Sequence, residues 1–263
     1  MPKGCYVYAI ARAGHPFPED VEAVDGSAHV DVVVDHDLAA FYSPVELDDF
    51  SQDAVDARAK DLDWLGAIGY RHQSVTSALQ RSGTILPLRA FTLFGSDVAV
   101  RAMLRERRPS LLASLARLDG KQEWTLRMEF EPKRWSEALA GRADSLRALA
   151  AGIADAPPGR AYLLGKKLEE ERKRASREAE EQVVAEIEAA VRSALACEAR
   201  TESRTDRGGA FPQINLLIER DEEARLEDLR AALETRYAGE GVTVVLTGPW
   251  PPYSFVEGEM GDG

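Results

Sequence analysis

The sequence is poor in cysteine and histidine, the side chains on which many metal and redox sites depend. Only Cys5 and Cys197 occur among 263 residues, with four histidines. Two cysteines so far apart in the chain supply neither a disulfide framework nor a zinc cluster. We therefore expect a protein of a reducing compartment, the cytoplasm.

Excess positive charge and long apolar runs are also missing. The chain has 33 Lys and Arg against 45 Asp and Glu, a net charge of -12. Such a balance does not attract nucleic acid or anionic lipid. No apolar run approaches the ~20 residues of a membrane helix, and the N-terminal segment lacks the apolar core of a signal peptide. We expect no nucleic-acid partner, no membrane span and no secretion.

The first half of the chain alternates between strand-like and helix-like patterns. Apolar alternation predicts strands, and apolar spacings of three, four and seven predict helices. The expected elements are strands at residues 5–12 and 29–37, a helix from an N-cap at Ser51 to about Arg81, a strand at 84–95, a helix at 96–120 that Pro109 should kink or divide, and a strand at 122–131. This order, ββαβαβ, predicts an α+β domain at residues 1–131 with helices on one face of its sheet.

The second half begins with a helical linker region at residues 132–159 and continues as a smaller α+β domain at 160–263. The Pro-Pro-Gly run at 157–159 predicts a helix from about Arg160 to Cys197. Its first part, Lys166 to Gln182, is charged and should be exposed, whereas an apolar stripe beginning at Val183 should dock. That stripe consists of Val183, Ile187, Ala190 and Ala194. Strands at 198–204, 213–220 and 242–248 and a helix at 221–237 complete the domain.

Two motifs suggest ligand chemistry, and the residues argue against both. "GRAYLLGKK" resembles a phosphate loop, but Gly159 and Gly165 enclose one residue too many, and Lys167 stands where the metal-binding hydroxyl should be. "HVDVVVDHD" places His29, Asp31, Asp35 and Asp37 on one strand face, with His36 on the other. A metal site needs ligands from several elements, so we interpret this face as exposed and polar.

Basic and nucleophilic residues give no catalytic site. Arg101, Arg105 and Arg108 lie at helical spacing and could meet an acidic partner or phosphate, but without interleaved aromatics a solvated helix face is favoured. No serine or cysteine lies in a nucleophile motif. We expect neither enzymatic activity nor a cofactor.

Several longer segments resemble one family. They are "YVYAIA" (6–11), "YRHQSVTSAL" (70–79), "ILPLRAFTLF" (85–94), "LARLDGKQEWTLRM" (115–128), "GRAYLLGKK" (159–167) and "LTGPWPPYSFV" (246–256). In this order they resemble the gas vesicle protein F/L family (GvpF/GvpL) over nearly the whole chain. The sequence departs from the family pattern at Ala90 and Phe91, where an aromatic and then a small residue usually follow the arginine. It departs again at Gln73, where an acid usually follows the histidine.

The resemblance implies an accessory role in assembling gas vesicles, without enzymatic activity. It implies an α+β fold of two ferredoxin-like α/β units joined and extended by helices. The implied partners are the small hydrophobic shell protein (GvpA-type) and other accessory gas vesicle proteins, and the implied location is the cytoplasm, in association with gas vesicles. The step could be that of a chaperone, a nucleation factor or a minor component of the wall.

Two proline-stiffened apolar segments are the candidate sites for binding a partner or joining the domains. The residues are Leu86, Pro87, Leu88, Arg89, Trp250, Pro251, Pro252, Tyr253 and Phe255. The prolines fix φ and bias the preceding residues toward extended geometry, so the tail is preordered. The tail aromatics either clip the tail across its own protein or contact the shell protein. Two other classes remain open: an enzyme that uses Arg89 on an anionic substrate, and an oligomeric scaffold built on the charged helix.

Overall fold

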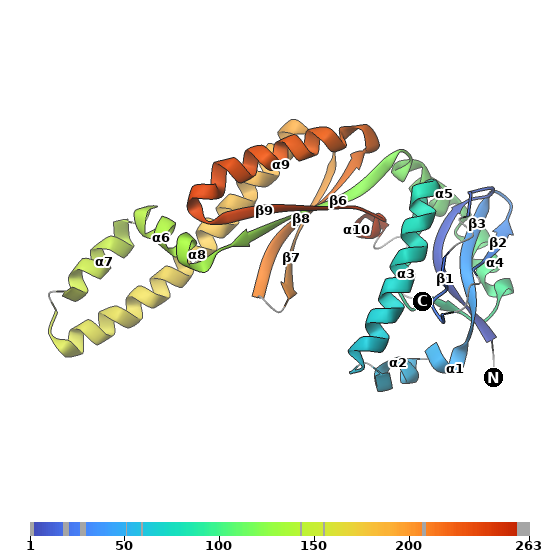
Figure 1. Cartoon of the computed structure of the whole chain (residues 1–263), viewed down its shortest axis with the longest axis horizontal. Coiled ribbons are helices and arrows are strands. Elements are labelled where there is room, and N and C mark those ends of the chain that lie inside the picture. The colour runs from blue at the N-terminus through green and yellow to red at the C-terminus, as the bar shows by residue number, and fades with distance from the viewer. Residues whose placement is uncertain are drawn as a thin grey trace. The chain divides into compact units, whose positions relative to one another are not determined.

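The chain forms two compact units in a computed structural model that describes residues 3–17, 21–26, 30–50, 52–58, 60–142, 144–154, 156–206 and 209–256. One unit groups Met1–Glu123 with Pro249–Gly263, and the other is Trp124–Gly248. The C-terminal tail is therefore grouped with the N-terminal part of the chain. The expected domain boundaries, at residues 131 and 159, differ from this grouping. Figure 1 shows the elements of each unit.

The first unit is built on a mixed set of strands and helices. Its elements are β1 (Lys3–Arg12), β2 (Asp31–Asp35), β3 (Leu38–Glu46), α1 (Leu47–Phe50), α2 (Gln52–Arg58), α3 (Leu62–Ser82), β4 (Ile85–Pro87), β5 (Leu93–Phe94), α4 (Asp97–Glu106), α5 (Arg108–Leu118) and α10 (Tyr253–Val256). The sheet has the order β2-β3-β1-β4, and β5 also pairs with β1. The pairing of β1 with β3 is antiparallel and contains an irregularity between Val7 and Ala9.

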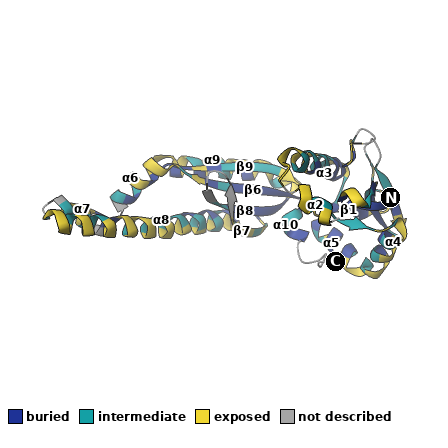
Figure 2. Ribbon diagram, turned by 90° about the horizontal axis from the view of Figure 1, so that it is seen from below, coloured by how far each residue is buried: buried dark blue, intermediate teal, exposed yellow. Residues whose placement is uncertain are grey.

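Helices cover both faces of this sheet, which corrects the expectation that they cover one. Side chains of α3 pack with Tyr6, Tyr8 and Phe41 in one apolar cluster. Helices α4 and α5 contact the strands from the other side (Figures 1 and 2). Strand β1 is consequently buried over nearly its whole length. The central strand β1 therefore reads as an apolar run, whereas β2, at the edge of the sheet, alternates between exposed and buried residues.

Four local expectations for this unit need correction. Strand β3 was not foreseen, although it pairs with both β1 and β2. The helix expected from Ser51 is divided: Ser51 lies outside the described residues, and α3 begins after Asp61, whose carboxylate accepts a hydrogen bond from Trp64 N. The strand expected at 84–95 is interrupted between β4 and β5, where Phe91 has a φ of 66°. The strand expected at 122–131 forms, but in the other sheet.

The expected division of the helix at 96–120 is confirmed. Helix α4 ends at Glu106, α5 begins at Arg108, and Pro109 lies in the first turn of α5. Proline is tolerated there because its missing N–H has no partner in the first turn of a helix. Ser96 caps α4 by accepting a hydrogen bond from Ala99 N at 3.2 Å.

The second unit has its own sheet and a long helix. Its elements are β6 (Lys121–Phe130), α6 (Pro132–Arg142), α7 (Asp144–Ala154), α8 (Pro158–Ala194), β7 (Glu198–Asp206), β8 (Gly209–Glu219), η1 (Arg220–Glu222), α9 (Glu223–Tyr237), η2 (Ala238–Glu240) and β9 (Val242–Trp250). The sheet order is β7-β8-β6-β9. Numbered within their own units, both sheets have the order second, third, first, fourth.

One face of the second sheet carries an apolar core and the other is polar. Trp124, Leu126 and Met128 of β6 cluster with side chains of α8 and α9. The predicted stripe of α8 is confirmed: Val183 and Ile187 are buried in this cluster, and Ala190 and Ala194 pack against it. On the opposite face, the Asn215 amide oxygen accepts hydrogen bonds from Thr125 Oγ1 at 3.0 Å and Gln213 Nε2 at 3.2 Å.

The charged part of α8 is helical and mostly exposed, as predicted. Among residues 166–182 only Leu168 is buried, while the charged side chains are exposed or half-buried (Figure 2). Arg174 pairs with Glu171 at 2.5 Å and Glu178 at 3.6 Å, both on exposed turns of the helix. "GRAYLLGKK" lies inside this helix, which leaves no loop there to hold a phosphate.

The fold class is α+β, as expected, and the ferredoxin-like character of the two units stays a prediction. Among the described residues, no helix is long and apolar enough to cross a membrane.

Candidate functional site

Four of the segments that resemble the gas vesicle family meet around α3 in the first unit. They are the start of β1, the middle of α3, the turn after β4 and the C-terminal tail with α10. The imidazole of His72 in α3 lies at their junction, with ring centroids 5.7 Å from Tyr6, 5.7 Å from Tyr8 and 6.2 Å from Tyr253. Residues far apart in sequence thus form one buried aromatic and polar cluster, which we call the His72 cluster.

Hydrogen bonds fix the tautomer of His72. Its Nε2 lies 3.0 Å from the carbonyl oxygen of Leu88, which can only accept, so Nε2 carries the proton. Its Nδ1 therefore accepts from the Tyr6 hydroxyl at 3.0 Å. The same hydroxyl accepts from the backbone N–H of Phe91 at 3.1 Å. One histidine and one tyrosine thus hold the turn after β4 against β1 and α3.

Burial keeps this cluster uncharged. Desolvation lowers the pKa of His72 to about 4, although the hydrogen bond to Leu88 opposes the change. Desolvation also raises the pKa of Tyr6 well above its usual range, and the pKa values of Tyr8 and Tyr253 to about 12. A neutral imidazole and protonated tyrosines at pH 7 act as fixed hydrogen-bond partners rather than as a general acid or base.

The C-terminal tail is held by polar contacts along its length. Gln80 Nε2 donates to the carbonyl oxygen of Trp250 at 2.7 Å, and the Tyr253 hydroxyl donates to Thr76 Oγ1 at 3.0 Å. Glu123 accepts from Ser254 N at 3.0 Å and from Ser254 Oγ at 2.6 Å. The tail is therefore fixed to α3 and to Glu123, which both belong to the first unit.

The end of the tail is anchored in the same way. The Arg117 guanidinium donates to the carbonyl oxygen of Phe255 at 2.5 Å, and α10 packs beside β4. Phe255 itself is 1% exposed. Gly248 has a φ of 142°, a backbone conformation that favours glycine. The strand does not end there as expected, because β9 runs on to Trp250.

The structure brings the two predicted segments into the same unit and divides their residues by exposure. Leu86, Pro87, Leu88, Pro251, Pro252 and Phe255 are buried, Tyr253 is half-buried, and Arg89 and Trp250 are exposed. A buried side chain cannot reach a partner without local unfolding. Trp250 and Arg89 are therefore the members of the predicted set that offer an accessible surface.

Sequence reasoning missed the polar side chains that hold the tail. Gln80, Arg117 and Glu123 were not singled out, and Gln80 and Glu123 are 7% and 4% exposed. Their pattern gave little signal, because each is a single polar residue in an ordinary helix or strand. A buried carboxylate within β6 needs a donor from elsewhere, and Ser254 supplies it from a distant part of the chain.

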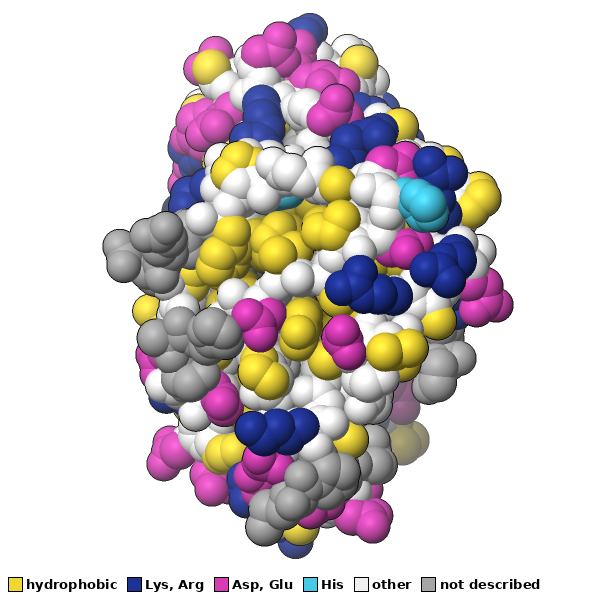
Figure 3. All heavy atoms as spheres, turned by 90° about the vertical axis from the view of Figure 1, so that its right-hand side faces the viewer, with side chains coloured by type: hydrophobic (Ala, Val, Ile, Leu, Met, Phe, Trp, Pro, Cys, Tyr) yellow, Lys and Arg dark blue, Asp and Glu magenta, His cyan; other side chains and the backbone are white. Residues whose placement is uncertain are grey.

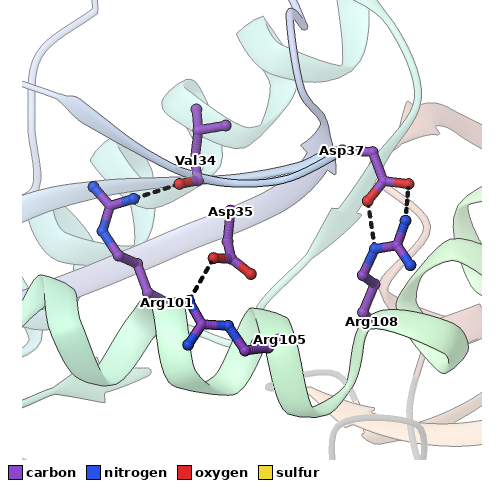
Figure 4. Close-up of polar contacts among 6 residues, drawn as sticks. All are labelled: Val34, Asp35, Asp37, Arg101, Arg105 and Arg108. Atoms are coloured by element: carbon purple, nitrogen blue, oxygen red, sulfur yellow. Dashed lines mark hydrogen bonds and ion pairs between the residues drawn. The ribbon is translucent and has the colours of Figure 1, made fainter.

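Arginines of α4 and α5 bind the acids of β2 and of the turn after it (Figure 4). Arg105 pairs with Asp35 at 2.9 Å, and Arg108 holds both oxygens of Asp37, at 2.7 and 2.8 Å. Arg101 donates to the carbonyl oxygen of Val34. The side chains of Arg105 and Arg108 stay 67% and 44% exposed, so this helix face is solvated as expected, and it also meets acids of the same protein. Hydrogen bonds from these arginines lower the pKa values of both aspartates.

The predicted polar strand face is not an open surface. Asp35 is 8% exposed beneath α4, whereas Val32 and Val34 on the opposite side are 53% and 40% exposed. His29 lies outside the described residues. In the described ranges, no group of three His, Cys, Asp or Glu side chains is placed to hold a metal ion.

Comparison with known proteins identifies the family. The family described as "Gas vesicle synthesis protein GvpL/GvpF" matches residues 4–257. Gas vesicle protein L of Streptomyces sp. (strain CB03234) is 31% identical over 95% of this chain and 91% of its own length. Gas vesicle protein L2 of Halobacterium salinarum is 31% identical over 89% of this chain and 80% of its own length. Gas vesicle protein F of the same Streptomyces strain is 29% identical over 96% of this chain and 99% of its own length.

Solved structures agree at the level of the fold. The crystal structure of GvpF from Anabaena sp. PCC7120 superposes with a TM-score of 0.72 over 97% of this chain and 98% of its own. The crystal structure of GvpF from Microcystis aeruginosa superposes with a TM-score of 0.66 over 97% of this chain and 99% of its own. Each is 15% identical to this chain, so the likeness concerns the fold alone. The chain belongs to the gas vesicle synthesis protein GvpL/GvpF family.

Proposed function

We propose that this chain is a non-enzymatic accessory protein of gas vesicle assembly that binds the small hydrophobic shell protein during nucleation or wall formation. It works in the cytoplasm, in association with gas vesicles and their other accessory proteins. A shell subunit with a gas-facing apolar surface is prone to aggregate before it is incorporated, so a binder that covers this surface assists assembly.

The observation that carries the proposal is that the backbone of Trp250 is held in place while its side chain is accessible. This residue is 40% exposed, while its own carbonyl is held by Gln80 and the two prolines after it are buried. A backbone that is already fixed loses little further entropy on binding. Tryptophan is also among the residues most often found to dominate binding energy at protein interfaces.

The surface of the first unit offers further apolar contacts. Besides Trp250, the exposed large aliphatic side chains among the described residues of this unit are Val32, Val34, Leu62 and Val98. Figure 3 shows hydrophobic side chains gathered on one face of the molecule, with charged side chains around them. An apolar area with a charged rim is the usual make-up of a protein-binding surface.

The proposal assigns different roles to the predicted site residues. Trp250 contacts the shell protein. The tail is held in place by the other apolar residues of the set, namely Leu86, Pro87, Leu88, Pro251, Pro252, Tyr253 and Phe255. Arg89 lies exposed after β4, and the proposal assigns it a polar contact with the same partner.

Light scattering during dilution of the shell protein from denaturant tests this function. We expect the purified chain, at equimolar concentration, to suppress aggregation of the shell protein and to elute with it on size exclusion. An unrelated acidic protein of similar net charge is the control. Unchanged aggregation with no co-elution would contradict the proposed function.

A further inference from the structure

A pocket of about 520 Å³ lies in the second unit, among the end of β6, α6, α7 and α8. Its interior is apolar: Met128, Trp135, Leu139 and Leu146 line it and are each less than a tenth exposed. The volume is within the range of roughly 300–1,000 Å³ that is typical of small-molecule sites. No residue of this pocket belongs to the tail or to the His72 cluster.

The two carboxylates that line the pocket already have partners. Glu129 pairs with Arg127. Glu180 accepts a hydrogen bond from Ser176 Oγ at 2.7 Å, and that hydroxyl accepts from the Trp135 indole N–H at 3.0 Å. This chain of hydrogen bonds fixes the indole in the pocket wall and engages one oxygen of Glu180.

The two cations that line the pocket differ from the carboxylates in this respect. Arg172 and Lys173 lie on neighbouring positions of α8, and both are exposed. Across the described part of the chain, neither makes an ion pair or a side-chain hydrogen bond. Elsewhere on the same helix, Arg174 and Arg192 are paired with glutamates. The pocket thus combines an apolar interior with positive charge that its own carboxylates do not neutralise.

We propose that this pocket binds a small amphiphilic anion, an apolar chain or ring system that ends in a single carboxylate. The apolar body lies against Trp135, Leu139 and Leu146, where it is removed from water. The carboxylate lies at Arg172 and Lys173, whose charge-assisted hydrogen bonds orient it. The site is independent of the proposed contact with the shell protein, because it uses other residues in the other unit.

Calorimetric titration with dodecanoate tests the site, and dodecyltrimethylammonium provides the same chain with the opposite charge. We expect one dodecanoate to bind per chain, with at least tenfold weaker binding of the cation. The double variant Arg172→Gln, Lys173→Gln should weaken dodecanoate binding at least tenfold. The matched double variant Lys167→Gln, Arg177→Gln changes two exposed cations of the same helix that do not line the pocket, and it should change binding less than twofold.

Three results would overturn the site. The first is equal binding of both surfactants, and the second is undiminished dodecanoate binding by the Arg172→Gln, Lys173→Gln variant, here called the pocket variant. The third is an equal loss of dodecanoate affinity in the two double variants. Phosphatidylglycerol vesicles distinguish a free ligand from a lipid in a bilayer. We expect that the protein does not co-sediment with these vesicles. Co-sedimentation of the parent that is lost only in the pocket variant would contradict a free ligand. All four substitutions are at exposed positions, so each variant should melt like the parent.

Discussion

The two units use the same strand order with different cores. In the first unit, helices cover both faces of the sheet, and the interior holds hydrogen-bonded polar groups such as the Tyr6–His72 pair. In the second, one face carries an apolar cluster and the other carries hydrogen-bonded polar side chains such as Asn215. An apolar core tolerates exchange of similar side chains, whereas a buried hydrogen-bond network requires particular ones.

Four of the six segments that resemble the family contribute to the network of the first unit. Tyr6, His72, Leu88 and Tyr253 come from four of the recognised segments, and all four belong to the first unit. Each segment contributes a group whose partner comes from another segment. These four motifs are thus parts of one polar network, whereas "GRAYLLGKK" lies in α8 of the second unit.

The largest effect should come from truncating a buried side chain of the tail. Phe255→Ala should cost about 3–5 kcal/mol, because Phe255 is 1% exposed and leaves a cavity. Hydrogen exchange should accelerate in β1, β4 and α3, although these lie far from the tail in sequence. Ile187→Ala is the matched change in the second unit and should cost about 2–5 kcal/mol.

Each of these variants should loosen its own unit most. The comparison fails if Phe255→Ala accelerates exchange mainly in β7 and β8, or if it leaves β1 as protected as in the parent. Either result would show that the tail does not stabilise the first unit.

The next effect is a pH dependence that belongs to the first unit. The pKa of His72 is about 4 in the folded protein, against roughly 6.5 in an unfolded chain. The unfolded state therefore takes up the proton first as the pH falls. The contribution of neutral His72 to the free energy of unfolding is complete above about pH 6.5 and is lost as the pH falls toward 4. The total loss is about 3 kcal/mol.

Denaturant unfolding between pH 7 and 4.5 measures this loss. His72→Gln keeps a donor and an acceptor but does not titrate, so it should be less stable than the parent at pH 7 and show a flatter pH dependence. If parent and variant lost stability in parallel over this range, titration of the His72 imidazole would not be the source of the pH dependence.

The smallest effect should be on the exposed turns of α8. Arg174→Ala removes pairs to Glu171 and Glu178 from a side chain that is 61% exposed. Exposed helical ion pairs contribute about 0.3–0.5 kcal/mol each, and salt screens them. Thermal unfolding at low and high salt should give a difference below about 1 kcal/mol that shrinks as salt is added. A loss comparable to that of Ile187→Ala would mean that this part of α8 belongs to the core.

Sequence patterns predicted much of the fold because periodicity reports which side of an element is buried. The stripe of α8, the division at Pro109 and most strands follow from spacing alone. Strand β3 was missed since Pro44 and the polar residues around it weaken the strand pattern, yet Pro44 pairs with Cys5 in the sheet. Sheet membership of β6 could not be predicted, because a strand pattern does not say which strand it pairs with.

The site was predictable only in part. Proline and aromatic residues marked the tail and the segment at β4 as unusual. They did not indicate which side chains elsewhere in the sequence bind these segments. The bonds from Gln80 to Trp250 and from Arg117 to Phe255 join residues more than a hundred positions apart. Likewise, nothing in the spacing of Arg105 and Arg108 indicates that their acids lie in β2 and in the turn after it. Such pairings follow from the tertiary fold and have no local signature.

The central claim is that Trp250 is fixed by its own protein and presented to the shell protein. Capture of the shell protein by Trp250→Ala tests it most directly, with Tyr70→Ala in the first unit and Tyr162→Ala in the second as exposed aromatic controls, 74% and 64% exposed. We expect Trp250→Ala to lose about 1–2 kcal/mol of stability, in keeping with partial burial, and to remain folded at 25 °C. It should capture at least tenfold less shell protein than the parent, while both controls capture it normally. Undiminished capture by folded Trp250→Ala would contradict the claim.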